Sequence, residues 1–192
     1  MNQKPPIFII TGPSGVGKTT IAHALLRRFK WLQKVTTHTT RTPRPGEIDG
    51  RDYHFVTPVE FEKKIKANEF LEHATVYGDS YGTAWKDVDA VANAGHAALF
   101  VVDVQGAKTL KRKLKTASLI FLAPDSLQSL RTRIGRRRSN ETPEQLERRM
   151  KTATDEMASQ GNADHIILNR QGERPLAIRA VAHVLKSKMQ GR

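Results

Sequence analysis

Residues 12–19 read Gly12-Pro13-Ser14-Gly15-Val16-Gly17-Lys18-Thr19 and satisfy the pattern G-x-x-x-x-G-K-[ST]. Glycines let the backbone curl so that successive N–H groups point at phosphate oxygens, and a following helix adds the positive end of its dipole. In such a phosphate-binding loop (P-loop), Lys18 can bridge the β- and γ-phosphates, and the hydroxyl of Thr19 can bind Mg²⁺. The motif therefore predicts a binding site for a nucleoside triphosphate, but it does not indicate the reaction.

The residues on both sides of this loop have the pattern that the loop requires. Residues 7–10 (IFII) form a short apolar run, which predicts a buried strand. From Gly17 onward, Ile21, Leu25 and Phe29 recur at helical spacing, which predicts a helix to about Lys30. A chance glycine loop would lack this order of strand, loop and helix.

Further along the chain, apolar runs and helical patterns alternate. The predicted strands are residues 97–102, 118–122 and 165–168, and the predicted helices are residues 58–68, 127–138, 143–160 and 175–189. Residues 36–50 are rich in Thr, Pro, Arg and Gly, which predicts a loop or an edge strand. Strands that alternate with helices indicate an α/β fold with a mostly parallel central sheet.

Two of these helices have a predicted buried side. In the helix over 58–68, Ile65 and either Val59 or Phe61 should point inward. In the last helix the apolar side comprises Ala177, Ala180, Val181, Val184 and Leu185. We interpret Trp31 and Trp85 as packing residues.

The composition fits one compact domain and excludes several classes of protein. The 192 residues are enough to bury a core. The absence of Cys excludes disulfides, zinc–thiolate sites and thiol nucleophiles. No apolar run approaches the roughly 18 residues of a membrane span, and the N-terminus lacks the pattern of a secretory signal. We therefore expect no membrane association and a cytoplasmic location.

The charge balance points to an anionic partner. The formal net charge is +13, and most of this excess lies between Lys108 and Lys151. Nucleic acid, a membrane surface and phosphorylated small molecules would all suit such a chain. Aromatic residues make up only 6% and do not interleave with the basic run, which disfavours a single-strand-binding protein. We therefore expect no nucleic-acid partner.

A second cluster of phosphate-binding side chains follows the P-loop. Arg41 and Arg44 are three residues apart in Thr39-Thr-Arg-Thr-Pro-Arg-Pro-Gly-Glu47, and the prolines stiffen the loop that presents the two guanidinium groups. Tyr53 comes nine residues later and could add a third donor. Each feature alone would be interpreted as a turn or as core packing.

In combination, these segments resemble guanylate kinase. The resemblance rests on GPSGVGKTT, TTRTPRPGEIDGRDYHFV, EFLEHATVYGDSYGT and VVDVQG, and it covers residues 7–169. It implies transfer of the γ-phosphoryl group of ATP to GMP, giving ADP and GDP, with Mg²⁺ as cofactor. It also implies a three-layer P-loop NTPase fold with a parallel central sheet. On this basis residues 1–35, 93–126 and 155–192 form the core, residues 36–92 an inserted GMP-binding subdomain, and residues 127–154 a helical lid.

The resemblance also implies roles for individual residues of the GMP site. The positions that hold the GMP phosphate are Arg41, Arg44, Tyr53 and Tyr81. Glu72 matches the carboxylate that reads guanine, and Thr37 and Thr83 match hydroxyl positions beside the base. Asp103 matches an acidic residue that serves the GMP site and Mg²⁺, directly or through water.

On the ATP side, the resemblance implies binding by residues 12–20, ending at Thr20, and by Asn169 near adenine. The lid arginines that match those around the transferring phosphates are Arg133, Arg137 and Arg149. Arg148 is the alternative to Arg149, because the alignment needs one extra residue in this segment. Lys18, Arg41 and the three lid arginines are the expected catalytic residues.

Three positions depart from the family pattern. Val101 stands where the family has a first acidic residue, Arg170 follows Asn169 where an Asp is usual, and His38 replaces a small hydroxyl residue. Phosphoryl transfer to a phosphate monoester, whose second pKa is about 6, needs no general base. In agreement, the sequence offers no convincing His–carboxylate pair. The seven histidines show no metal-ligand spacing, so we interpret each as exposed or capping.

Two alternatives to a guanylate kinase remain open at the level of the sequence. One is a non-catalytic interaction module of the same fold, although such modules have a degraded P-loop and flanking domains. The other is a related P-loop kinase that acts on another phosphorylated sugar or nucleotide. Whichever applies, the chain could be a monomer or a homodimer.

Overall fold

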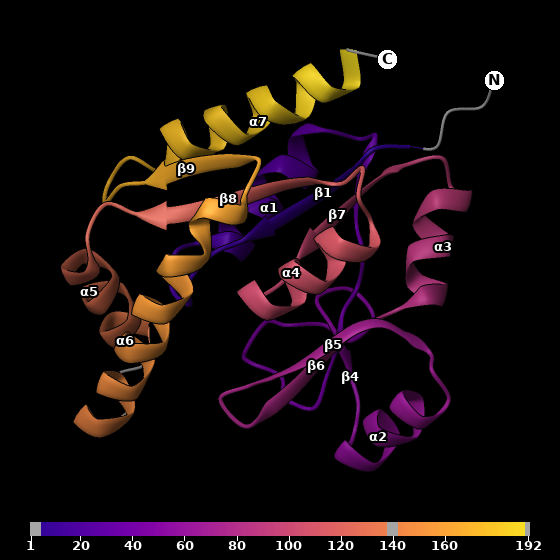
Figure 1. Ribbon diagram of the computed structural model, residues 1–192, viewed down its shortest axis with the longest axis horizontal. Coiled ribbons are helices and arrows are strands. Elements are labelled where there is room, and N and C mark those ends of the chain that lie inside the picture. Colours follow the sequence, from indigo (N-terminus) through magenta and orange to yellow (C-terminus); the bar gives the residue numbers. More distant parts are fainter. Residues whose placement is uncertain (1–4, 138–141, 191–192) are drawn as a thin grey trace.

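The computed structural model describes residues 5–137 and 142–190, and its core is a five-stranded sheet (Figure 1). In spatial order the strands are β2 (Leu32–Lys34), β7 (Ala97–Val101), β1 (Ile7–Thr11), β8 (Ser118–Pro124) and β9 (His165–Asn169). Every neighbouring pair is parallel. The predicted parallel sheet is therefore confirmed, with β2 as a strand that the apolar pattern did not predict.

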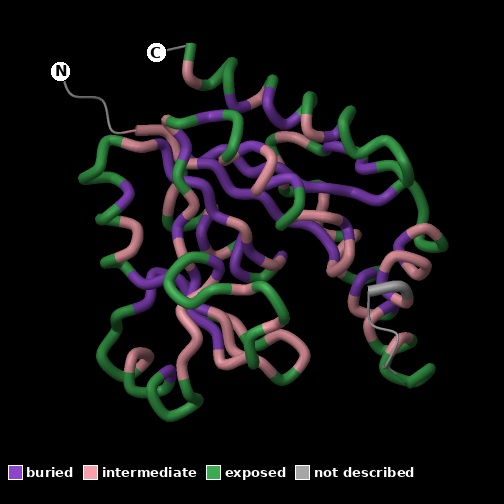
Figure 2. The backbone as a smooth tube through the Cα atoms, turned by 180° about the vertical axis from the view of Figure 1, so that it is seen from behind, coloured by how far each residue is buried: buried purple, intermediate pink, exposed green. Residues whose placement is uncertain are grey.

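Helices cover both faces of this sheet, which gives the predicted three layers (Figure 1). The helices α1 (Lys18–Arg28) and α7 (Arg174–Gln190) pack on one face, and α3 (Trp85–Asn93) and α4 (Val104–Lys113) pack on the other. Side chains of a strand alternate between faces, so Phe8 joins the core under α1 and α7 while Ile9 joins the core under α3 and α4. Figure 2 shows the sheet as the continuous buried centre of the molecule.

A smaller four-stranded sheet lies beside the core. Its order is β4 (His54–Phe55), β3 (His38–Thr39), β6 (Asp79–Ala84) and β5 (Phe70–Val76). Helix α2 (Pro58–Lys66) begins with a capping box between Thr57 and Glu60 and buries Phe61 against Phe70. Phe61, not Val59, is thus the inward residue of this helix. Residues 36–50, expected to be a loop or an edge strand, contain β3, which is an inner strand because it pairs with β4 on one side and β6 on the other.

Two further helices stand at the end of the core sheet, across from the smaller sheet (Figure 1). They are α5 (Leu127–Arg137) and α6 (Pro143–Met157), and a short 3-10 helix, η1 (Ala158–Asn162), leads from α6 to β9. Leu130 and Ile134 of α5 and Met150 of α6 pack into the core on the α1 side. The base of this helical pair is therefore anchored in the core.

Some sequence-based expectations differ from the structure. Ala180 of α7 is exposed and Ala182 is buried instead, because the helix presents a slightly rotated face to the sheet. Trp31 stacks on Phe29 with a centroid distance of 4.9 Å, as a packing residue should, whereas Trp85 is 45% exposed. Among the helices that the structure describes, none has the length and apolar character needed to cross a membrane.

Candidate active site

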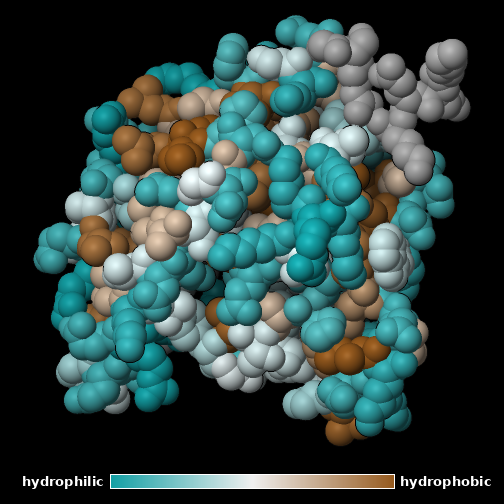
Figure 3. Space-filling model, in the orientation of Figure 1, coloured by the Kyte–Doolittle hydropathy of each residue, from teal (hydrophilic) through white to brown (hydrophobic). Residues whose placement is uncertain are grey.

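A cleft of about 360 Å³ separates the core sheet, the smaller sheet and α6. The residues predicted from the sequence that line it are Ser14, Gly15, Gly17, Lys18, Thr19, Thr20, Thr37, Arg44, Tyr53, Glu72, Tyr81, Asp103 and Arg149. Val101, one of the departures from the family pattern, also lines the cleft. The fold therefore brings both predicted phosphate-binding clusters to one cavity. The space-filling view shows a hollow between the helical pair and the rest of the molecule, and hydrophilic residues surround it (Figure 3).

The P-loop joins β1 to α1, and its backbone conformation favours glycine at Gly12 and Gly17. Gly12 has φ +135°, and a Cβ there would lie 2.2 Å from the carbonyl oxygen of Leu122. Gly17 has φ +104° and immediately precedes α1. The Lys18 ammonium donates hydrogen bonds to the carbonyl oxygens of Gly12 (2.5 Å) and Pro13 (3.2 Å). Lys18 thus lies folded along the loop whose phosphate ligand it is expected to hold.

Glu72 contributes a buried carboxylate to the lining of the same cleft. The Thr83 hydroxyl donates a 2.7 Å hydrogen bond to Oε1, and the carboxylate is only 4% exposed. A Cβ on Gly106 would lie 2.8 Å from Oε2, so the glycine leaves room for the carboxylate beside the first turn of α4. Burial raises the pKa of Glu72 to about 7; the hydrogen bond from Thr83 opposes this rise and the nearby charge of Asp103 adds to it.

Arg41 and Arg44 lie in the loop after β3, where Glu47 organises them. Arg41 donates to both carboxylate oxygens of Glu47, at 2.9 and 2.8 Å, and the backbone N–H of Arg44 donates to Oε2 at 2.8 Å. Burial disfavours the charge on Arg41, but the hydrogen bonds to Glu47 prevail and raise its pKa. The Arg41 guanidinium also lies over the rings of Tyr53 (5.4 Å) and Phe55 (5.8 Å). The loop is therefore held by an internal bidentate ion pair.

Hard oxygen donors gather between the P-loop and the Glu72 pocket. Asp103 caps α4, its Oδ1 accepting from the backbone N–H groups of Gln105 (2.7 Å) and Gly106 (3.1 Å). Glu156 of α6 accepts a long hydrogen bond from the backbone N–H of Ser14 (3.4 Å), and burial raises its pKa. With the hydroxyl of Thr19 at the start of α1, this donor set is of the type that Mg²⁺ prefers.

The helical pair reaches the smaller sheet through Arg149. Its guanidinium lies 4.2 Å from the ring centroid of Tyr77, in the two-residue turn between β5 and β6. Tyr77 and Gly78 both have positive φ, 54° and 88°, as a type I′ turn requires. Arg148 is exposed and does not line the cleft, so Arg149 is the residue that faces it. The side chain of Arg137 lies outside the described residues.

Comparisons with known proteins agree with this geometry. The family model described as guanylate kinase matches residues 4–188. The chain belongs to the guanylate kinase family. Guanylate kinase of Thiobacillus denitrificans is 43% identical over 163 residues, which are 85% of this chain and 78% of that protein. Guanylate kinase of Rickettsia bellii is 43% identical over 167 residues, 87% of both chains.

A solved structure supports the same conclusion at the level of the fold. The crystal structure of guanylate kinase from Anaplasma phagocytophilum superposes with a TM-score of 0.78 at 30% identity. The match covers 96% of this chain and 86% of that one. The resemblance drawn from the sequence motifs is thereby confirmed.

Of the residues predicted on the ATP side, Gly12, Pro13, Val16, Asn169 and Arg133 lie outside the lining of the cleft. Asn169 is 4% exposed and donates from Nδ2 to the carbonyl oxygen of Val16 (2.7 Å), so it supports the P-loop from below. Arg133 donates from Nη2 to the carbonyl oxygen of Asn169 (2.7 Å) and lies 3.8 Å from Asp125. Asn169 thus connects the end of β9 to the P-loop, and Arg133 connects the end of β9 to α5. In this structure both side chains stabilise the packing around β9.

Several residues in or beside the cleft were not predicted. Glu156 and Tyr77 line the cleft, and Glu47 pairs with Arg41 beside it. Lys34 lies 4.9 Å from the ring centroid of Tyr53, and burial lowers its pKa. Glu47 and Tyr77 fall inside the quoted motifs, but no spacing rule indicated their partners. Lys34 and Glu156 carry no local signal, because only the fold brings them to the site.

The interpretation of the histidines is wrong in one place. His38 is only 2% exposed, so it is neither a surface nor a capping residue. It lies 3.5 Å from Asp87, and His54 lies 3.4 Å from the same carboxylate. The fold thus creates His–carboxylate pairs between residues that are far apart in the sequence.

Proposed function

We propose that this guanylate kinase transfers the γ-phosphoryl group of ATP to GMP, or dGMP, in the cleft described above. One observation carries the proposal: the P-loop and the buried carboxylate of Glu72 line a single cavity. Such a cavity can hold the two nucleotides with their phosphates toward each other. Positioning and charge neutralisation are the main requirements of phosphoryl transfer.

ATP binding is assigned to residues 12–20. Successive backbone N–H groups and the N-terminus of α1 would hold the β- and γ-phosphates. Lys18 would exchange its bonds to the P-loop carbonyls for the phosphates and follow the charge as it moves to the leaving oxygen. Asn169 would act on the adenine side by supporting the loop.

Mg²⁺ is the proposed metal, with Thr19 as a ligand and Asp103 acting directly or through water. Glu156 adds a third oxygen donor that sequence motifs did not indicate. When bound, the ion would neutralise charge on the β- and γ-phosphates. Its charge would also favour the ionised form of Glu156, whose pKa burial raises.

The GMP phosphate is assigned to Arg41, Arg44, Tyr53 and Tyr81. Arg44 and both tyrosines line the cleft, and the tyrosine rings meet edge to face at 6.2 Å. Arg41 reaches the phosphate only by loosening its bidentate pair with Glu47. The dianionic phosphate therefore competes with Glu47 for the guanidinium.

Guanine recognition is assigned to Glu72, with Thr37 and Thr83 beside it. The Watson–Crick edge of guanine carries N1–H and an N2 amino group, two adjacent donors that a carboxylate can accept together. Adenine presents an acceptor at N1, which would face a buried oxygen. A site built around hydrogen bonds can reject such an analogue by roughly 10⁴-fold or more. Thr83 already donates to Glu72, so it orients the carboxylate.

We further propose that residues 36–92 act as the GMP-binding subdomain and residues 127–154 as a lid. Arg133, Arg137 and Arg149 would surround the transferring phosphates when the lid closes. The contact between Arg149 and Tyr77 supports this assignment, because it already links α6 to the smaller sheet across the cleft.

A coupled assay of ADP release tests the proposal. Purified protein with ATP and Mg²⁺ should release ADP rapidly with GMP and dGMP, and far more slowly with AMP and UMP. Omission of Mg²⁺ should abolish turnover. Protein that binds ATP but releases no ADP with GMP would overturn the proposal in favour of an interaction module. Turnover with a different phosphorylated acceptor would favour a related kinase.

A further inference from the structure

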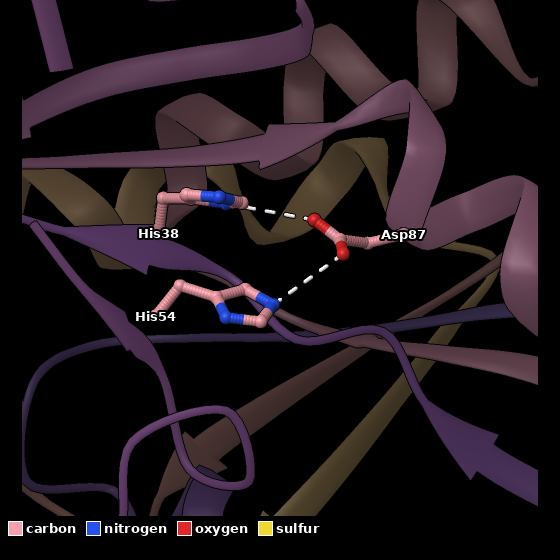
Figure 4. Close-up of side chains that lie close together, drawn as sticks. All are labelled: His38, His54 and Asp87. Atoms are coloured by element: carbon pink, nitrogen blue, oxygen red, sulfur yellow. Dashed lines mark ion pairs between the residues drawn. The ribbon is translucent and has the colours of Figure 1, made fainter. Parts of the chain in front are cut away.

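His38, His54 and Asp87 form a compact cluster away from the nucleotide cleft (Figure 4). His38 and His54 are direct neighbours across the parallel pair β3–β4, and both rings point toward the carboxylate of Asp87 in the first turn of α3. One donor atom from each residue can be chosen so that all three lie within 4.8 Å of one another.

The cluster lies on the face of the smaller sheet opposite the Glu72 pocket. Residues paired across strands point to the same face, and successive residues point to opposite faces. His38 pairs with Gly82, whereas Glu72 pairs with the next residue, Thr83. No residue of the cluster lines the nucleotide cleft, so the assigned ATP, GMP and Mg²⁺ sites do not account for it.

The contacts inside the cluster are longer than hydrogen bonds. Nδ1 of His38 lies 3.5 Å from Oδ2 of Asp87, and Nε2 of His54 lies 3.4 Å from Oδ1. Within the described part of the chain, Nδ1 of His38 and Oδ2 of Asp87 have no hydrogen-bond partner, although both are buried. Buried polar atoms that lack a protein partner are rare in native proteins, and binding of an ion is one way in which they are satisfied.

We propose that His38, His54 and Asp87 bind a divalent transition-metal ion, with Zn²⁺ as the best match. Two imidazoles and one carboxylate are a known ligand set for zinc, which then keeps a fourth position for water. With bonds of about 2.0–2.1 Å, two ligands of a tetrahedral zinc ion lie about 3.4 Å apart. The imidazole nitrogens of His38 and His54 lie 3.5 and 3.4 Å from different oxygens of Asp87, so each imidazole is about one such edge away from the carboxylate.

The surroundings keep the ligands ready for a metal. The ring of His38 packs against the ring of Phe70 at a centroid distance of 5.5 Å and against the ring of His54 at 4.5 Å, so packing fixes the direction of this imidazole. The carboxylate of Asp87 lies in the first turn of α3, which places it opposite the two imidazoles (Figure 4).

The exposed side of the cluster gives an ion access. The side chain of His54 is 30% exposed, that of Asp87 is 16% exposed and that of His38 is 3% exposed. A bound water would therefore complete the coordination on the His54 side. The ion would connect β3 and β4 to α3, the helix that carries the chain from the smaller sheet to β7 of the core. Its expected role is to stabilise this junction.

Metal binding can be measured on the untagged full-length chain after treatment with a chelator. Co²⁺ serves as the spectroscopic probe, because a tetrahedral Co²⁺ site absorbs strongly in the visible region, and Zn²⁺ should displace it with one equivalent. At a Zn²⁺ concentration about 100-fold above Kd, the Tm should rise by about 5–10 °C. The assay contains no nucleotide, so its outcome does not depend on kinase activity.

Three substitutions make the assignment specific. Asp87→Asn and His54→Gln each remove one ligand and should weaken binding of Co²⁺ and Zn²⁺ at least tenfold. His73→Gln is the matched control, because His73 lies on the same face of the smaller sheet but is exposed and outside the cluster. Asp87→Asn keeps the shape of the side chain, and His54 is partly exposed, so at least one variant should fold, as circular dichroism in chelator would show.

The Co²⁺ and Zn²⁺ titrations of the four proteins distinguish a metal site from a packing arrangement. One tight equivalent that is lost in Asp87→Asn or His54→Gln and kept in His73→Gln supports the site. No displaceable Co²⁺ spectrum in the wild-type chain, or equal affinity in the wild type and both ligand variants, overturns it. In that case the cluster is a packing arrangement of the smaller sheet only.

Discussion

Glu72 should lower the stability of the protein at neutral and alkaline pH, where its carboxylate is ionised and can accept hydrogen bonds from guanine. Burial raises its pKa from 4.5 to about 7, and its side chain is 4% exposed. The native state therefore binds more protons than the unfolded chain between these two values. The free energy of unfolding should fall as the pH rises through this window. At 1.36 kcal/mol per pH unit, the full cost of ionising Glu72 in the fold is about 3 kcal/mol above pH 7.

The substitution Glu72→Gln removes this titration while keeping the shape of the side chain. Relative to the wild type, the variant should gain about 3 kcal/mol of stability at pH 8.5, or about 5–10 °C in Tm, and less than about 1 kcal/mol at pH 5. The hydroxyl of Thr83 can accept as well as donate, so it can pair with the new amide.

Loss of function should accompany this gain of stability. Glutamine offers one acceptor and one donor to guanine, so Glu72→Gln should raise the KM for GMP and narrow the ratio of kcat/KM between GMP and AMP. In the wild type, GMP needs the ionised carboxylate, so the KM for GMP should rise as the pH falls below about 7. The variant should lack this part of the pH dependence and keep only that of the GMP phosphate.

Two measurements test the reasoning. Urea unfolding of wild type and variant at pH 5 and 8.5 gives the stability difference, and kcat/KM for GMP, dGMP, AMP and UMP gives the selectivity. A stability difference that is the same at both pH values would show that Glu72 is not a costly buried charge. An unchanged ratio between GMP and AMP would show that the carboxylate is structural.

Three more substitutions probe the P-loop, the pocket wall and the lid contact. Lys18→Ala should lower kcat at least tenfold with little loss of stability, because a charge-assisted contact contributes about 1.5–3 kcal/mol; near-normal turnover in the ADP assay would contradict its role. Gly106→Ala places a Cβ 2.8 Å from the Glu72 carboxylate and should raise the KM for GMP about tenfold while kcat is largely kept, which steady-state kinetics would test. Tyr77→Ala removes the ring beneath Arg149 and should speed hydrogen exchange in α6 about threefold or more, whereas Tyr77→Phe should not; equal exchange in both variants would rule out the contact.

Local patterns were sufficient for the parts of the fold that depend on local chemistry. The P-loop could be read from residues 12–19, because curling the backbone around phosphate needs glycines at fixed positions, and Gly12 and Gly17 do have positive φ. The strands β1, β7 and β8 were predictable because a strand buried on both faces is a continuous apolar run. The strand β9 is also an apolar run, although it lies at the edge of the sheet and exposes Ile166 and Leu168 on one face. The family itself followed from motifs that are specific in combination.

Strands with one polar face were harder to predict. In β5 and β6 apolar and polar side chains mix, since one face packs on α2 and the core while the other faces the cleft. Their motif was recognised, but their strands were not. The helix α4 was not predicted either, although the motif at its start was recognised. Its exposed side is strongly basic, and only a few of its side chains, such as Ala107 and Leu110, are buried.

Only the tertiary structure could establish the electrostatics of the site and the partners of its charges. The raised pKa of Glu72 depends on burial against α4, which lies more than thirty residues further along the chain. The spacing of Arg41 and Glu47 allowed many arrangements, and the fold of their loop selects a bidentate pair. The cluster of His38, His54 and Asp87 has no sequence signature, because its members come from two strands and a helix. Burial and long-range contact decide these properties, and neither is encoded in the spacing of residues along the chain.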